Sequence, residues 1–191
     1  MKGLSIVGAV AALALCCGAS SASASTVFCN TNASPCPAGN TYAVGTAVTS
    51  KPKNEIKVFS PVLPTMSCAS GKLNGTITST GVSFKEFQLG CVSSWESCVV
   101  EGRNLPWSST LTAGTAGNGT LTISSARLYF NCSKGLPCEV EASNVPLSVV
   151  GGGAATPALL KINSTFTRVA GCASSDQKRL EGSFEITAPK P

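Results

Sequence analysis

The segment 127–142 reads RLYFNCSKGLPCEVEA, and its pattern decides the fold class. In its first six residues Leu128 and Cys132 fall on one side of an extended chain, and polar residues alternate with them on the other. Its last five residues repeat the alternation, with Cys138 and Val140 on the inner face and a glutamate after each. A period of two is typical of a half-buried β-strand, so this segment predicts two strands joined by a short loop.

Similar segments, rich in Val, Ile, Thr and Phe, alternate with clusters of Gly, Ser, Asn and Pro along the rest of the chain. The further predicted strands are 41–49, 54–59, 71–79, 82–91, 98–103, 109–112, 119–124, 145–150, 158–168 and 180–187. No helical period with start and stop signals follows the first 24 residues. About a dozen short strands predict an all-β domain, either a β-sandwich or, as its competitor, a Greek-key barrel, in both cases stapled by disulfides.

The first 24 residues predict a signal peptide. Lys2 is followed by an apolar run over 4–17 and by the small-x-small cleavage site Ala22-Ser23-Ala24. The apolar run is shorter than the about 20 residues that a membrane-spanning helix needs. We therefore expect residues 25–191 to form a single exported β-rich domain that does not span a membrane and is secreted or held in the cell envelope.

The cysteines predict a disulfide framework. Two of the ten lie in the predicted signal peptide; a lipid anchor there is the lesser alternative, because neither follows a small residue. The other eight are Cys29, Cys36, Cys68, Cys91, Cys98, Cys132, Cys138 and Cys172. An even number in an exported chain indicates disulfides. Zinc and redox sites favour closer cysteine pairs, often with histidine, so we expect no metal and no cofactor.

The pairing of the eight cysteines follows from their separations, because the entropy cost of closing a loop grows with its length. The predicted bridges are Cys29–Cys36, Cys91–Cys98, Cys132–Cys138 and, by elimination, Cys68–Cys172. An alternative pairs Cys68 with Cys91 across neighbouring strands and leaves Cys98 for Cys172.

The chain has no histidine, which removes the Ser-His-Asp and Cys-His nucleophile systems and the most common general base. Glu139 and Glu141 should lie about 7 Å apart on one strand face, a span compatible with an acid/base pair but also common on a solvated strand. We therefore expect a non-enzymatic protein, with a histidine-free secreted hydrolase as the alternative.

Four residues are candidates for binding. The aromatic residues Trp95, Trp107 and Tyr129 could form a platform for sugar rings or a partner protein. In the competing interpretation Trp95 fills its own loop and Trp107 belongs to the core. Lys134 lies between two cysteines in a loop similar to the reactive loop of Bowman-Birk-type serine-protease inhibitors, but this loop is shorter and lacks the Thr before the basic residue.

Charge is moderate and scattered, with 14 basic and 9 acidic residues and a net charge of +5. A nucleic-acid surface would gather its basic residues with aromatic ones, so no nucleic-acid partner is expected.

The segment VFCNTNASPCPAGNTYAVGT at 27–46, Leu89-Gly90-Cys91 and the closing LEGSFEITAP carry a resemblance. The matched positions are Cys29, Asn32 (shifted by one), Cys36, Tyr42, Gly45, Thr46, Gly182, Phe184 and Ile186. They are similar to a family of exported, cysteine-containing, β-rich bacterial proteins of unknown function. The resemblance implies a bacterial exported domain and supplies no activity or site. We expect a binding or structural role in the cell envelope or extracellular space, with an envelope glycan or protein as partner.

Overall fold

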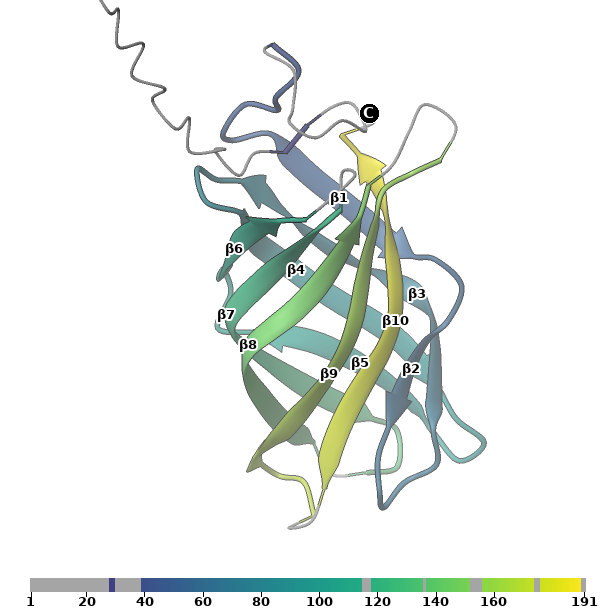
Figure 1. The fold of residues 1–191 in the computed structure, drawn as a ribbon. Helices are drawn as coiled ribbons and strands as arrows, with labels where there is room; N and C mark the ends of the chain where they lie inside the picture. Colours follow the sequence, from purple (N-terminus) through teal and green to yellow (C-terminus); the bar gives the residue numbers. More distant parts are fainter. Residues whose placement is uncertain are drawn as a thin grey trace, which may run out of the picture.

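The computed structural model describes residues 28–29, 39–114, 118–135, 137–151, 156–173 and 176–189. These residues form strands and no helix (Figure 1). The strands are β1 (Ala47–Pro52), β2 (Ile56–Phe59), β3 (Met66–Ile77), β4 (Val82–Val92), β5 (Ser97–Arg103), β6 (Trp107–Ala113), β7 (Gly119–Cys132), β8 (Cys138–Val150), β9 (Leu159–Ala170) and β10 (Gln177–Ala188). Across these described ranges, no helix has the length and apolar character needed to cross a membrane.

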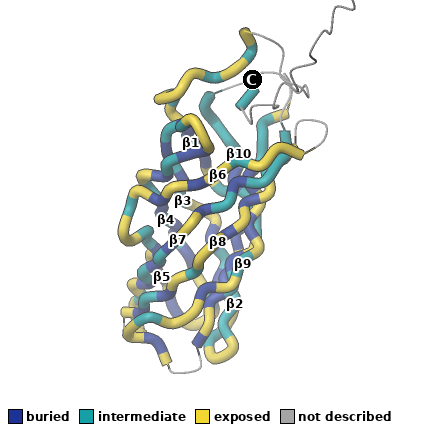
Figure 2. The backbone as a smooth tube through the Cα atoms, turned by 60° about the vertical axis from the view of Figure 1, so that its left-hand side comes forward, coloured by how far each residue is buried: buried dark blue, intermediate teal, exposed yellow. Residues whose placement is uncertain are grey.

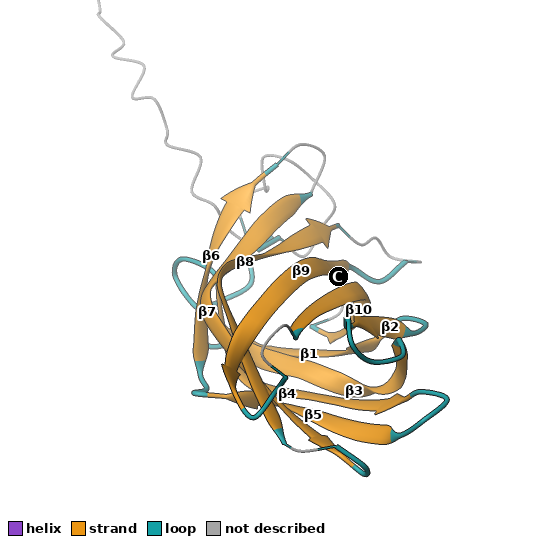
Figure 3. Cartoon of the chain, turned by 90° about the horizontal axis from the view of Figure 1, so that it is seen from below, coloured by secondary structure: helices purple, strands orange, loops and turns teal. Residues whose placement is uncertain are grey.

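The strands close into an antiparallel barrel. They follow one another round the ring in chain order, and β10 returns to pair with both β1 and β2. Because β1 and β2 share one position in the ring, and β5 and β6 share another, the barrel has 8 strand positions (Figure 3). The all-β class is confirmed, and the architecture is the barrel rather than the β-sandwich. Its strands run in simple up-and-down order instead of the Greek-key order that was expected of a barrel.

The two shared positions contain a break in the strand, and an asparagine lies at each break. Asn54, between β1 and β2, has a φ of 67°, and Asn104, between β5 and β6, has a φ of 55°. Asparagine tolerates this left-handed conformation better than most residues. The predicted strands at 119–124 and 127–132 instead join into the single strand β7, and those at 138–142 and 145–150 join into β8.

The barrel interior is filled by side chains. Buried and exposed residues alternate along the strands, as the period of two predicts (Figure 2). The interior retains a cavity of about 10 Å³ with an apolar lining that includes Phe87, Ile123 and Phe184. This volume is room for about one water molecule, and an eight-stranded barrel is typically just wide enough for side chains to fill. The cavity is therefore too small for an organic ligand.

Three disulfides link the strands near one end of the barrel. They are Cys68–Cys91, Cys98–Cys132 and Cys138–Cys172. This pairing contradicts the predicted bridges Cys91–Cys98, Cys132–Cys138 and Cys68–Cys172. The alternative was right about Cys68–Cys91 and wrong about Cys98–Cys172. Cys29 is also disulfide-bonded, but its predicted partner Cys36 lies outside the described residues, so Cys29–Cys36 stays a prediction.

The sheet register explains why the predicted hairpin bridge does not form. Cys91 lies opposite Cys68 on one side and opposite Cys98 on the other. At the hairpin turn the Ser93 amide donates to the Glu96 carbonyl, so two residues further along, Cys91 and Cys98 form a pair of the hydrogen-bonded type. The pair on the other side of Cys91 is then of the non-hydrogen-bonded type, in which side chains lie closer together. The Cα atoms of Cys68 and Cys91 are accordingly only 3.9 Å apart.

Three disulfides within one chain are typical of proteins that fold in oxidising compartments such as the extracellular space.

Candidate functional site

The barrel end that carries the disulfides combines an exposed apolar tip with a buried charged cluster. Because the strands run up and down, the connections β2–β3, β4–β5, β7–β8 and β9–β10 all lie at this end, the lower one in Figure 1. The described parts of these connections bring together side chains that are far apart in the sequence.

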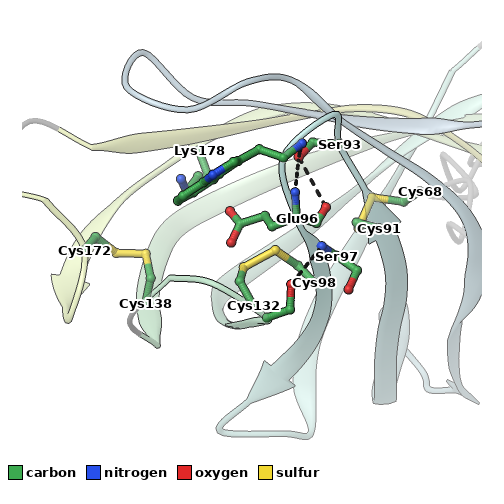
Figure 4. Close-up of a disulfide and its surroundings, with 12 residues drawn as sticks. Cys68, Cys91, Ser93, Glu96, Ser97, Cys98, Cys132, Cys138, Cys172 and Lys178 are labelled. Carbon is green, nitrogen blue, oxygen red and sulfur yellow. Dashed lines mark hydrogen bonds between the residues drawn. A yellow bond between two sulfur atoms is a disulfide. The ribbon is translucent and has the colours of Figure 1, made fainter.

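The β4–β5 turn is organised by Ser93. Its hydroxyl oxygen accepts hydrogen bonds from the amides of Trp95 at 3.2 Å and of Glu96 at 3.1 Å (Figure 4). Serine is common in turns because its short side chain accepts hydrogen bonds from backbone amides that have no partner on a neighbouring strand. The two residues differ in burial. Trp95 is 44% exposed to solvent, whereas Glu96 is only 7% exposed.

Three exposed apolar residues define the hairpin-tip surface: Val92, Trp95 and Val99. Their exposed fractions are 59%, 44% and 41%, and they belong to the few large apolar side chains exposed in the described chain. Val92 and Val99 lie on the outer face of adjacent strands, since Val92 pairs with Ser97 and Val99 with Gly90. The hairpin itself is held on both sides by disulfides, Cys68–Cys91 on β4 and Cys98–Cys132 on β5.

Lys134 is exposed and lies close to this tip. The Ser133 amide donates to the Ser97 carbonyl at 2.9 Å, and the Ser97 amide donates to the Ser133 hydroxyl at 3.3 Å. These contacts hold the start of the β7–β8 connection beside β5. No disulfide closes that connection on itself, because Cys132 is bonded to Cys98 and Cys138 to Cys172. The loop closed by Cys132–Cys138, on which the similarity to an inhibitor loop depended, is therefore not formed.

The other two candidate aromatic residues do not join the tip. Trp107 is 4% exposed, its ring packs against Phe87 with 5.6 Å between centroids, and its indole NH donates to the Arg103 carbonyl at 2.7 Å. Tyr129 is half-buried on the outer face of β7, where the guanidinium of Arg103 lies 4.3 Å from its ring centroid. Trp95, Trp107 and Tyr129 thus do not form the platform that was considered.

A buried charged cluster lies behind the hairpin tip, and sequence reasoning missed it. Lys178, Asp176 and Glu96 are 2%, 4% and 7% exposed. The Lys178 Nζ atom lies 2.7 Å from Asp176 Oδ2, and the Ser60 hydroxyl donates to Asp176 Oδ1 at 2.7 Å. The available signal was the strand pattern, because Lys178 occupies an inward-facing position two residues before the fully buried Leu180.

Two atoms of this cluster are buried without a hydrogen-bond partner in the described chain: Glu96 Oε2 and Lys178 Nζ. The Lys178 ammonium group is in contact with the Asp176 carboxylate, but the contact lacks hydrogen-bond geometry. The ring centroid of Phe130 lies 5.8 Å from the same nitrogen. Unsatisfied buried polar atoms are rare in native proteins, which makes this cluster unusual.

Two groups of potential metal ligands converge at this end, but their sulfur atoms are already bonded. Glu96 lies near Cys98 and Cys132, and Asp176 lies near Cys138 and Cys172, with ligand atoms within 4.8 Å in each group. Metal binding by cysteine requires a free thiolate, and all four cysteines are in disulfides. These groups therefore give no argument for a metal site.

Glu139 and Glu141, the carboxylates considered as an acid/base pair, share one cation. Arg127 Nε lies 3.5 Å from Glu139 and 3.9 Å from Glu141 on the outer face of β7 and β8. The arrangement is an ion-pair network, which accounts for both carboxylates without catalysis.

Comparison with known proteins adds no assignment. No protein-family model matches the chain, and no curated protein and no solved structure match it.

Proposed function

We propose that this protein is an exported, non-enzymatic binding protein that contacts an envelope glycan through the hairpin-tip surface of Val92, Trp95 and Val99. The observation that carries the proposal is the 44% exposed Trp95 at the tip of a hairpin that two disulfides hold. An indole presented on a rigid support loses little conformational entropy when it stacks on a sugar ring, which favours binding.

The filled interior supports an outer-surface function. A barrel that carries a small molecule inside needs an internal cavity large enough to hold it. The volume of the cavity here is about 10 Å³, whereas the smallest typical ligand pockets have a volume of about 300 Å³. Recognition by this barrel is therefore assigned to its outer surface and loops. Of the five large apolar side chains that are exposed in the described chain, three belong to the hairpin-tip surface.

Co-sedimentation of the purified protein with insoluble envelope polysaccharide from the source organism tests the proposal. We expect Trp95→Ala to weaken binding by about 10-fold, in line with the loss of one central aromatic contact. Val44→Ala is the matched control, because Val44 is 69% exposed and precedes β1 at the opposite end of the barrel. Equal binding by the two variants, or binding only to the envelope protein fraction, would reject the glycan proposal.

The two alternatives have less support. The carboxylates considered for a histidine-free hydrolase, Glu139 and Glu141, form an ion-pair network with Arg127. The side chains of Glu96, Asp176 and Lys178 are nine-tenths or more buried. A protease inhibitor presenting Lys134 would lack the disulfide-closed loop on which the comparison with such inhibitors rested.

A further inference from the structure

We propose that Lys178 and Asp176 condense into an intramolecular isopeptide bond inside the closed end of the barrel. The nucleophile and the electrophile are already in contact, with Lys178 Nζ 2.7 Å from Asp176 Oδ2. Both side chains are almost fully excluded from solvent, at 2% and 4% exposure. The proposal concerns a modification of the chain itself and is independent of the glycan proposal.

Burial favours condensation over a persistent ion pair. Two charges removed from water lose much of their solvation, and their mutual attraction offsets this loss only when further hydrogen bonds satisfy both groups. Here the ammonium group has no hydrogen bond in the described chain, and the Phe130 ring lies on it with 5.8 Å from Nζ to the centroid. An amide carries no net charge, so its formation removes the unsatisfied cation.

A neighbouring hydroxyl group matches what amide formation needs. The Ser60 hydroxyl donates to Asp176 Oδ1 at 2.7 Å, the oxygen on which negative charge develops when an amine attacks the carboxyl carbon.

The reaction balances without any further reactant. A proton passes from the Lys178 ammonium group to Asp176 Oδ2, which leaves a neutral amine and a neutral carboxylic acid. The nitrogen lone pair forms a bond to Asp176 Cγ, and the charge on Oδ1 is held by the Ser60 hydroxyl. The nitrogen then gives a second proton directly to the departing oxygen. The Cγ–Oδ2 bond breaks, and one water molecule leaves for each amide formed.

Mass spectrometry of the exported chain, fully reduced, alkylated and denatured, tests the proposal. We expect the wild-type mass to be lower than the mass calculated from the sequence by one water molecule. Trypsin does not cleave after an acylated lysine, so the peptide 169–179 should be recovered uncut at Lys178 and lighter by the same amount. The full calculated mass together with cleavage after Lys178 would overturn the proposal.

Three variants separate the isopeptide bond from other losses of water. Lys178→Arg keeps the positive charge beside Asp176 but lacks the amine, so its mass should be the full calculated one. A water loss that persists in Lys178→Arg would identify cyclisation of Asp176 onto its own backbone and would sink the proposal. Ser60→Ala should give a mixture in which less of the chain has lost water. Glu96→Gln is the control and should keep the wild-type mass difference, because Glu96 forms no ion pair with Lys178 in the described chain. If Lys178→Arg does not fold, the wild-type peptide alone decides the question.

Discussion

Cys91 faces Cys98 across the β4–β5 hairpin, yet its disulfide runs the other way, to Cys68 on β3. The same row continues to Cys132, which lies opposite Cys98 on β7 and is bonded to it. Four cysteines therefore cross four neighbouring strands in one line, and the alternation of backbone pairing selects which neighbours bond.

Peptide mapping of the unreduced protein checks this selection. We expect one linked peptide pair containing Cys68 and Cys91 and another containing Cys98 and Cys132, because the Cα atoms of these pairs lie 3.9 and 4.0 Å apart. Recovery of a Cys91–Cys98 link in freshly folded protein would contradict the selection of Cys68 as the partner of Cys91. Mapping in the presence of a thiol-blocking reagent is the control against exchange during digestion.

Local sequence patterns predicted the strands but not the bonds between them. The alternation around Phe130 and Val140 predicted which residues face inward, because a strand's period of two follows from its own geometry. Closure of the barrel depends on β10 reaching β1 and β2, and no local pattern encodes that pairing. The disulfide prediction failed for the same reason: separation along the chain measures loop entropy, whereas the bonds follow cross-strand register.

The candidate site was predicted only in part. Trp95 was predicted either to contribute to a binding platform or to fill its own loop, and its side chain is 44% exposed but does not join the other two aromatic residues. Lys178 was overlooked because the last predicted strand, 180–187, began two residues too late to include it, whereas β10 begins at Gln177. Its position two residues before Leu180 was the signal that it faces the interior.

The two tryptophans should contribute very differently to stability. Trp107→Ala should lower the free energy of unfolding by about 3–5 kcal/mol, because the ring is buried against Phe87. Trp95→Ala should change it by no more than about 0.5 kcal/mol, as is usual for exposed positions. Urea denaturation of both variants measures the difference. Similar losses in the two variants would show that the tip is part of the folded core.

Gly182 should resist substitution because Ile56 of β2 lies close against it. Its φ is +157°, and an added Cβ would lie 2.9 Å from the Cα atom of Ile56 on β2. We expect Gly182→Ala to destabilise the protein by about 1–3 kcal/mol in urea denaturation. Gly45→Ala is the matched control, since Gly45 also has a positive φ of +91° but open space around its Cα atom. An equal loss in both variants would attribute the effect to the backbone conformation alone.

The outer ion pair of β3 and β4 should make a small pH-dependent contribution. A hydrogen bond from Lys72, followed by one from Asn74, lowers the pKa of Glu86 below its usual value. A lowered folded-state pKa gives stability that is present above the unfolded-state pKa and is lost as the pH falls through the folded-state pKa. Because the Glu86 side chain is 45% exposed, solvent screening limits the contribution to about 0.5 kcal/mol.

Urea denaturation of Glu86→Gln at several pH values measures this contribution. The variant should be less stable than wild type at neutral pH, and the two should converge in acid. Glu55→Gln, at an exposed glutamate between β1 and β2, is the control. A difference between Glu86→Gln and wild type that persists unchanged in acid would assign the effect to packing instead of charge.

The return of β10 to β1 and β2 also sets an order of assembly. Every other pairing joins strands that are near in sequence, so these hairpins are able to form while later residues are still missing. The ring itself cannot close until the last strand is present, and until then β1, β2 and the newest strand expose unpaired backbone edges. A chain that stops before residue 177 would keep those edges permanently. Such truncated chains should accumulate as aggregates even though most of their hairpins are intact.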